Sequence, residues 1–202
     1  MAKLEFYFDL ASPYSRIACH RLKVWRKENH AQLECIPVSL TAILKDSSGE
    51  TALQHKKRMH SLVDLKRAAC LYEISDFDTS SSRIQANLKS KEIRLKMIEL
   101  ANRGITFDDL ELLYKKYWSF SCTEQKDPIT CNQDATKKQT FSSEGQVKLL
   151  ENTKKAIEMG AFGLPWFRLF RSGRDAQAYF GSDRLEHISL DVQENIANKS
   201  KL

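Results

Sequence analysis

The start of the chain alternates polar and apolar residues and then breaks at a Ser-Pro pair, which constrains the fold more than any other feature. Residues 4–9 alternate and are rich in aromatic side chains, a pattern typical of a β-strand. Ser12 is a favourable N-cap and Pro13 suits the first helical position, because its missing N–H group would have no helical partner there. The pattern predicts a helix and then a second strand over residues 32–38, near a sheet edge because it contains Pro37.

The remainder of the chain separates into a helical middle and a mixed end. Residues 40–155 show helical periodicity with charged faces, in segments such as 51–72, 81–102 and 107–118, and no strand signal of comparable strength occurs there. After them, Gly160 suits a left-handed helix C-cap and Pro165 introduces a strand. A hairpin signal at residues 171–174 leads to another strand, and Ser182 can cap a last helix. We therefore expect β-α-β and β-β-α ends around a helical insertion.

Composition restricts the class of protein and its partners. The 202 residues are 42% hydrophobic and 29% charged, which indicates one globular body rather than a disordered or repetitive chain. The longest apolar stretches are too short to cross a bilayer, and no secretory leader is recognised, so we expect a soluble protein without a membrane partner. The net charge of +6 arises from basic residues without interleaved aromatics, which argues against nucleic acid. Five cysteines without a CxxC pair predict reduced thiols and no metal site.

Three short motifs resemble a known family. Residues 6–9 followed by Ser-Pro-Tyr-Ser at 12–15 resemble the start of the DsbA disulfide oxidoreductase superfamily, with serine where redox members carry the first cysteine. Gly-Ala-Phe-Gly-Leu-Pro at 160–165 and Phe-Gly-Ser-Asp-Arg at 180–184 resemble kappa-class glutathione transferases and the related 2-hydroxychromene-2-carboxylate isomerases. The resemblance implies an α/β thioredoxin-like fold with an inserted helical domain. The thioredoxin-like domain would comprise residues 1–45 plus 146–202, and the insertion residues 46–145.

Ser12 is the candidate catalytic residue. A serine at a helix N-terminus is most often only a cap, but a strand-to-helix loop offers N–H groups and a helix dipole that favour an anion such as a thiolate. The resemblance implies that this thiolate belongs to glutathione and that Ser12, rather than Ser15, stabilises it. Neither serine can act as a redox thiolate, so disulfide exchange is excluded, and Cys19 is expected to be a buried structural thiol.

The resemblance also implies a set of glutathione contacts. Pro165 would be cis, Leu164 would pair its backbone with the cysteinyl part, and Ser182 and Asp183 would bind the γ-glutamyl group. Lys57 would bind the glycine carboxylate. Each has an ordinary structural explanation as a strand start, a helix cap or a solvated helix face. The full set of expected glutathione-binding residues is Pro13, Tyr14, Lys57, Leu164, Pro165, Ser182 and Asp183.

Several positions depart from the family or allow two explanations. Residues 48–50 stand where the family uses an asparagine, so that contact is altered or lost. Arg16 replaces an aromatic or aliphatic residue and either shapes the second-substrate pocket or points to solvent, the ordinary expectation. Tyr117 and Trp118 either form a hydrophobic wall of the electrophile site or pack in the core.

The motifs together predict a kappa-class glutathione transferase that conjugates glutathione to small electrophiles or reduces hydroperoxides, with glutathione as cosubstrate and no bound cofactor. A glutathione-dependent isomerase of the hydroxychromene carboxylate type and a non-catalytic glutathione- or peptide-binding protein are the alternatives. The resemblance implies a homodimer. Ser200, Lys201 and Leu202 match the peroxisomal address that the import receptor reads, so we expect a peroxisomal protein, or otherwise a soluble intracellular and mitochondrial one.

Overall fold

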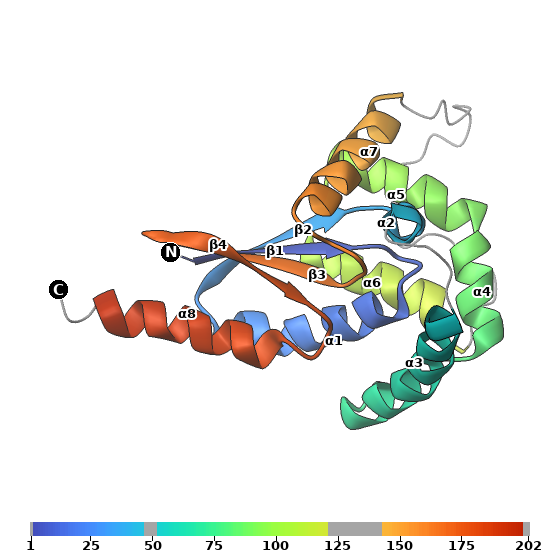
Figure 1. Ribbon diagram of the computed structural model, residues 1–202, viewed down its shortest axis with the longest axis horizontal. Helices are drawn as coiled ribbons and strands as arrows, with labels where there is room; N and C mark the ends of the chain where they lie inside the picture. Colours follow the sequence, from blue (N-terminus) through green and yellow to red (C-terminus); the bar gives the residue numbers. More distant parts are fainter. Residues whose placement is uncertain (1, 47–51, 121–142, 200–202) are drawn as a thin grey trace.

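A four-stranded mixed sheet forms the centre of the computed structural model, which describes residues 2–46, 52–120 and 143–199 (Figure 1). The side chains of residues 52–59 and 194–199 are not described. The strand order is β2-β1-β3-β4, in which β1 runs parallel to β2 and antiparallel to β3, and β3 pairs antiparallel with β4. The strands are β1 (Ala2–Phe8), β2 (Ala31–Pro37), β3 (Trp166–Arg171) and β4 (Arg174–Phe180). Pro37 ends an edge strand, as the sequence predicts.

Helices cover the sheet and extend beyond the end at which β1 stops. Helices α1 and α8 lie side by side on one face of the sheet, and α3 and α4 lie past its end (Figure 1). The helices are α1 (Pro13–Glu28), α2 (Leu40–Asp46), α3 (Ala52–Leu71), α4 (Ser81–Lys89), α5 (Lys91–Arg103), α6 (Phe107–Trp118), α7 (Ser143–Glu158) and α8 (Leu185–Lys199). None of the described helices is long and apolar enough to cross a membrane.

Aromatic side chains join the sheet to α6 in the core. Phe6 stacks on Phe167 across β1 and β3, with ring centroids 5.3 Å apart, and Phe8 meets Tyr114 of α6 edge-on at 6.4 Å. All four rings are fully buried. Aromatic pairs of this kind stabilise a core beyond the area that they bury. The aromatic strand that the sequence predicts at the start of the chain is one of the two inner strands of the sheet.

Two element boundaries differ from the prediction. The helix expected over 81–102 is two helices, because the Ser90 side chain accepts a hydrogen bond from the Ile93 backbone and caps a new helix, α5. Ser182 was expected to cap the last helix, but this is wrong: α8 begins at Leu185, and Ser182 lies in the turn before it. Gly160 has φ +90° after α7, as expected for a left-handed C-cap. The division into domains at residues 45 and 146 stays a prediction.

Candidate functional site

Asp9 holds the loop between β1 and α1 in place from inside the protein. Its carboxylate accepts the backbone N–H of Ala11 at 2.9 Å and that of Leu40, at the start of α2, at 2.7 Å. Its carbonyl accepts the Ser12 N–H at 2.9 Å. Burial raises the pKa of Asp9 to about 6, although the two backbone hydrogen bonds act in the opposite direction. The buried Asp9 carboxylate therefore links the loop that precedes α1 to the start of α2.

The end of α6 clamps the same loop. The Tyr114 hydroxyl donates to the Asp9 carbonyl at 2.9 Å, and Trp118 Nε1 donates to the Leu10 carbonyl at 2.8 Å. Trp118 is fully buried and Tyr117 is 5% exposed, and neither lines the cavity described below. The sequence left two explanations open for this aromatic pair, and core packing is the one observed.

Ser12 and Pro13 begin α1 as the sequence predicts. The Ser12 hydroxyl oxygen accepts the Ser15 backbone N–H at 3.2 Å, and Pro13 occupies the first helical position. The capping bond uses the oxygen as an acceptor, so the hydroxyl hydrogen can still donate. Ser12 is only 1% exposed and is not among the residues that line the neighbouring cavity. The serine is a cap in this structure, and its proposed role toward a thiolate stays a prediction.

A cavity of about 1030 Å³ opens beside the first turn of α1. Three parts of the chain form it: the start of α1, the exposed face of α3 and the two turns that flank β3 and β4. Its volume lies near the upper end of the range for small-molecule sites. The lining residues are Tyr14, His60, Ser61, Asp64, Arg67, Ala68, Leu71, Tyr72, Leu164, Pro165, Phe180, Gly181, Ser182 and Asp183.

Five of the expected glutathione-binding residues meet in this cavity. Tyr14 comes from α1, and the Leu164–Pro165 peptide bond is cis, as expected from the resemblance. The Pro165 carbonyl accepts the Gly181 N–H at 3.1 Å, which holds this turn against the one that carries Ser182 and Asp183. The structure therefore brings together residues that are more than 150 positions apart in the sequence.

Tyr14 forms a wall of the cavity and joins two helices. Its hydroxyl donates to the Ser61 carbonyl of α3 at 2.8 Å and lies 3.3 Å from Asp64 Oδ2. Burial raises the pKa of Tyr14. The hydroxyl therefore acts as a neutral donor toward α3, and Tyr14 lines the cavity.

Arg21 is a positioning residue that the sequence analysis missed. Its guanidinium donates to the Ser182 carbonyl and pairs with Glu186 of α8. It also lies over the ring of Tyr72, 4.2 Å from the centroid, a cation–π contact. Arg21 follows Tyr14 by seven residues, two helical turns, so the helical period alone places both on the same face of α1. The turn with Ser182 is thus fixed to α1 by a charged side chain.

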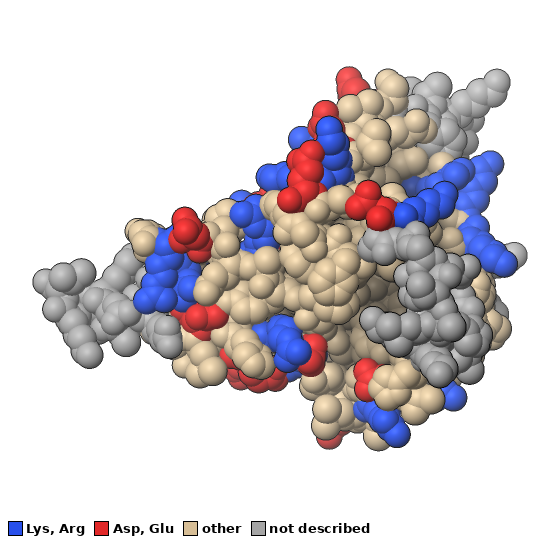
Figure 2. All heavy atoms as spheres, in the orientation of Figure 1, with Lys and Arg blue, Asp and Glu red and all other residues tan. Residues whose placement is uncertain are grey.

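Other predicted residues lie elsewhere. Arg16 was expected in solvent, but this is wrong, because it is only 3% exposed, and Glu111 and Tyr114 of α6 are among its electrostatic neighbours. Cys19 is fully buried, as expected. Lys57 belongs to α3, but its side chain lies outside the described residues, as do the substituted loop 48–50 and the C-terminal residues 200–202. On the face shown in Figure 2, Lys and Arg form small groups, most of them beside Asp or Glu.

Comparison with known proteins places these features in one family. The model of the DSBA-like thioredoxin domain matches residues 3–193, nearly the whole chain. The chain belongs to the DSBA-like thioredoxin family. The α/β thioredoxin-like fold expected from the sequence is confirmed by this match and by the strand order above.

This DSBA-like protein is similar to a named relative and to two solved structures. Glutathione S-transferase kappa 1 of Caenorhabditis elegans is 24% identical over 208 residues, which cover 95% of this chain and 91% of the relative. A solved 2-hydroxychromene-2-carboxylate isomerase has the same fold, with a TM-score of 0.55, 21% identity and 98% of each chain covered. A probable DsbA oxidoreductase of Streptomyces coelicolor gives a TM-score of 0.46 and 11% identity, with 98% of this chain and 91% of that chain covered.

Proposed function

We propose that this DSBA-like protein is a glutathione transferase of the kappa class. The observation that carries the proposal is the cavity beside the first turn of α1, in which the cis Leu164–Pro165 turn meets Ser182 and Asp183. The near full-length similarity to a protein named glutathione S-transferase kappa 1 supports it. Half of the residues that line the cavity belong to the motifs noted in the sequence, namely Tyr14, Leu164, Pro165, Phe180, Gly181, Ser182 and Asp183.

Glutathione would lie extended across the cavity. The backbone of Leu164 would pair with the cysteinyl part of glutathione as a strand pairs with its neighbour. The turn at Ser182 and Asp183 would bind the γ-glutamyl end, where the Asp183 carboxylate can accept from the ammonium group. This arrangement would direct the sulfur toward the N-terminus of α1. The first turn of α1 contains no acidic residue, so its positive dipole end is not neutralised there.

Ser12 would stabilise the thiolate by donating its hydroxyl hydrogen to the sulfur. The thiol proton leaves to solvent, and the sulfur electron pair then forms a C–S bond with an electrophilic carbon while the leaving group departs with its bonding electrons. In hydroperoxide reduction, two glutathione molecules become one disulfide, and the peroxide becomes an alcohol and water. The chain supplies binding, orientation and charge stabilisation for both reactions.

The first test measures the ultraviolet absorbance of the bound glutathione thiolate as a function of pH. The wild type is compared with three Ser12 variants. In the wild type we expect the pKa of the bound thiol to lie well below the usual value of ~8.5. Ser12→Ala should raise it toward that value and reduce conjugation at least tenfold. Ser12→Asn can still cap α1 but has no hydroxyl, whereas Ser12→Thr keeps both functions. Activity in the Thr variant and its loss in the Asn variant would assign the effect to the hydroxyl.

Other results would select another function. Glutathione binding without conjugation, peroxidase or isomerase activity on a substrate panel would indicate a binding protein. Rearrangement of a substrate without net consumption of glutathione would indicate an isomerase. A wild-type chain that binds no glutathione would contradict the proposal.

Gly181 offers a test of the γ-glutamyl end of the site. A Cβ atom at this position would lie 2.5 Å from Asp183 Oδ1, and the backbone has φ +109°. Gly181→Ala should therefore displace the carboxylate and weaken glutathione binding about tenfold, with about 1 kcal/mol lost from the free energy of unfolding. Gly173→Ala is the matched control, since Gly173 has φ +75° but no atom within 4 Å of the added Cβ. Calorimetric titration should show weakened binding in the Gly181 variant alone, and equal affinities would contradict the assignment.

The homodimer and the peroxisomal location remain predictions. We propose both on the sequence resemblance and on the C-terminal Ser-Lys-Leu. Sedimentation of the purified chain tests the dimer, and the location of a tagged chain with and without Ser200 to Leu202 tests the address.

A further inference from the structure

Arg16 is a buried cation, and two of its three guanidinium nitrogens have no hydrogen-bond partner among the described residues. Its Nε and Nη1 atoms are shielded from solvent and make no hydrogen bond within the described parts of the chain. A buried charge without a partner is costly, and each such group in a native protein requires an explanation. Arg16 remains protonated at any working pH even though burial lowers its pKa, so the charge persists.

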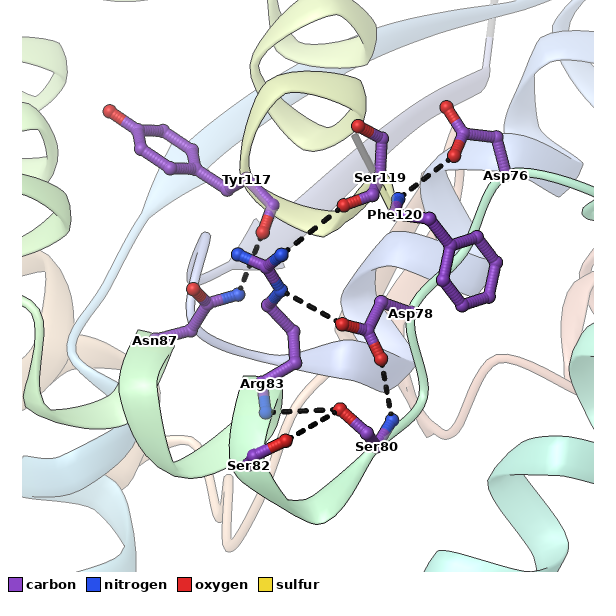
Figure 3. Close-up of polar contacts among 9 residues, drawn as sticks. All are labelled: Asp76, Asp78, Ser80, Ser82, Arg83, Asn87, Tyr117, Ser119 and Phe120. Atoms are coloured by element: carbon purple, nitrogen blue, oxygen red, sulfur yellow. Dashed lines mark hydrogen bonds and ion pairs between the residues drawn. The ribbon is translucent and has the colours of Figure 1, made fainter. Parts of the chain in front are cut away.

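The carboxylates nearest to Arg16 have other partners. Glu111 of α6 forms ion pairs with Lys23 and Lys115 at 3.0 and 3.2 Å. Asp76 accepts the Phe120 N–H at 3.0 Å, as Figure 3 shows. The remaining groups that face Arg16 are the Cys19 thiol and the Tyr114 hydroxyl, whose pKa values burial raises well above the ordinary range, and the His20 side chain. No described group therefore neutralises this cation through an ion pair.

The surroundings of Arg16 place its charge near the N-terminus of α1. Helical side chains point toward the N-terminus of their helix, and residues four apart share a face, so Arg16 lies on the face of Ser12. Tyr114 also bonds to the loop that enters α1. The segment with Asp76 is held to the end of α6, where the Asp78 N–H donates to the Trp118 carbonyl at 2.7 Å. Figure 3 shows that Arg83 Nε also donates to the Asp78 carboxylate. The Ser15 hydroxyl, beside Arg16, is also buried without a partner.

We propose that Arg16 is the internal counter-cation of a negatively charged sulfur at the N-terminus of α1, and that it makes this site select ligands whose sulfur group is anionic. Arg16 acts as a positioning residue through its charge and need not touch the ligand. The inference rests on the proposed function, because it takes the ligand to be glutathione. A charge buried in this way is screened little by salt, so the preference should persist at high ionic strength.

The test is a calorimetric titration with two glutathione derivatives. Glutathione sulfonate carries a permanent negative charge at the sulfur, and S-methylglutathione carries none there. In Arg16→Met we expect the sulfonate to bind about tenfold more weakly, the effect of removing one nearby charge in a medium of low dielectric constant. Binding of S-methylglutathione should be unchanged. Arg16→Lys keeps a charge and should recover part of the affinity for the sulfonate.

A second arginine of α1 provides the control for the Arg16 variants. Arg26→Met removes another α1 arginine, which pairs with the exposed Asp108 at 2.6 Å, and should leave both affinities unchanged. Equal losses for both ligands in Arg16→Met, or no loss for either, would overturn the inference while the proposed function stands. If the wild type binds neither ligand, both are overturned. If Arg16→Met does not fold, the same two titrations of the wild type at high salt still test the inference. A preference for the sulfonate that disappears at high salt would contradict a buried counter-charge.

Discussion

Between pH 4 and pH 7, the Asp9→Asn variant is expected to gain about 2 to 3 kcal/mol of stability relative to the wild type. The Asp9 pKa is raised from 3.8 to about 6 by burial, so the folded wild type holds a proton that the unfolded chain has already lost. The contribution of Asp9 to stability is therefore complete below pH 3.8 and declines as the pH rises to about 6. Asparagine does not titrate, so this decline is absent from the variant.

Urea denaturation at closely spaced pH values measures this difference directly. Asparagine has a single carbonyl oxygen for the two N–H groups of Ala11 and Leu40, which lowers the stability of the variant by a similar amount at every pH. The slope against pH therefore isolates the ionisation of Asp9. Asp108→Asn is the control for loss of an exposed carboxylate, since the Asp108 side chain is 73% exposed although it pairs with Arg26. A parallel pH dependence of wild type and Asp9→Asn would contradict the burial of a charge at Asp9.

Replacement of Trp118 by alanine is expected to cost about 3 to 5 kcal/mol of the free energy of unfolding. Trp118 is fully buried, meets Phe77 edge-on with centroids 5.6 Å apart, and donates to the Leu10 carbonyl. The substitution opens a large cavity and also leaves that carbonyl without its partner. Because the carbonyl belongs to the loop that enters α1, we expect glutathione binding to weaken as well.

Trp118→Phe separates the two contributions. Phenylalanine fills much of the space but cannot donate, so we expect a loss of about 1 to 2 kcal/mol, in the range of an unpaired buried acceptor. Leu112→Ala on the same helix removes a side chain that is 44% exposed and should cost far less. Chemical denaturation of the three variants gives the comparison. If Trp118→Ala unfolds as readily as Leu112→Ala, the clamp on the loop does not stabilise the fold.

The elements with strong local signals were predicted closely. Helix α6 runs from Phe107 to Trp118 as expected, because the Thr106 side chain caps it through the Asp109 N–H. Pro13 begins α1 for a similarly local reason, since its ring restricts φ to a helical value. The boundary at Ser90 was missed because a single serine inside a periodic pattern resembles an exposed helical residue until its capping bond is seen. Ser182 was misplaced because Arg21 ties its carbonyl to α1 and α8 begins later.

The candidate site was only partly accessible to sequence reasoning. The motifs named Leu164, Ser182 and Asp183, and the structure places them around one cavity with Tyr14. The role of Arg21 could be anticipated only from helical spacing, since the group it binds lies 161 positions away. Lys57 and the C-terminal address remain predictions.

Caps, a proline at a helix start and alternating strands depend on a few neighbouring residues, so the order of elements and the family can be read along the chain. The state of each buried polar group depends instead on partners far away in sequence. Asp9 and Leu10 receive hydrogen bonds from side chains 105 and 108 positions further on. Arg16 is buried, and its electrostatic neighbours include Glu111 and Tyr114 of α6 and Asp76. Whether such a charge is solvated, paired or isolated is decided by which surfaces pack together, and only the tertiary structure determines that.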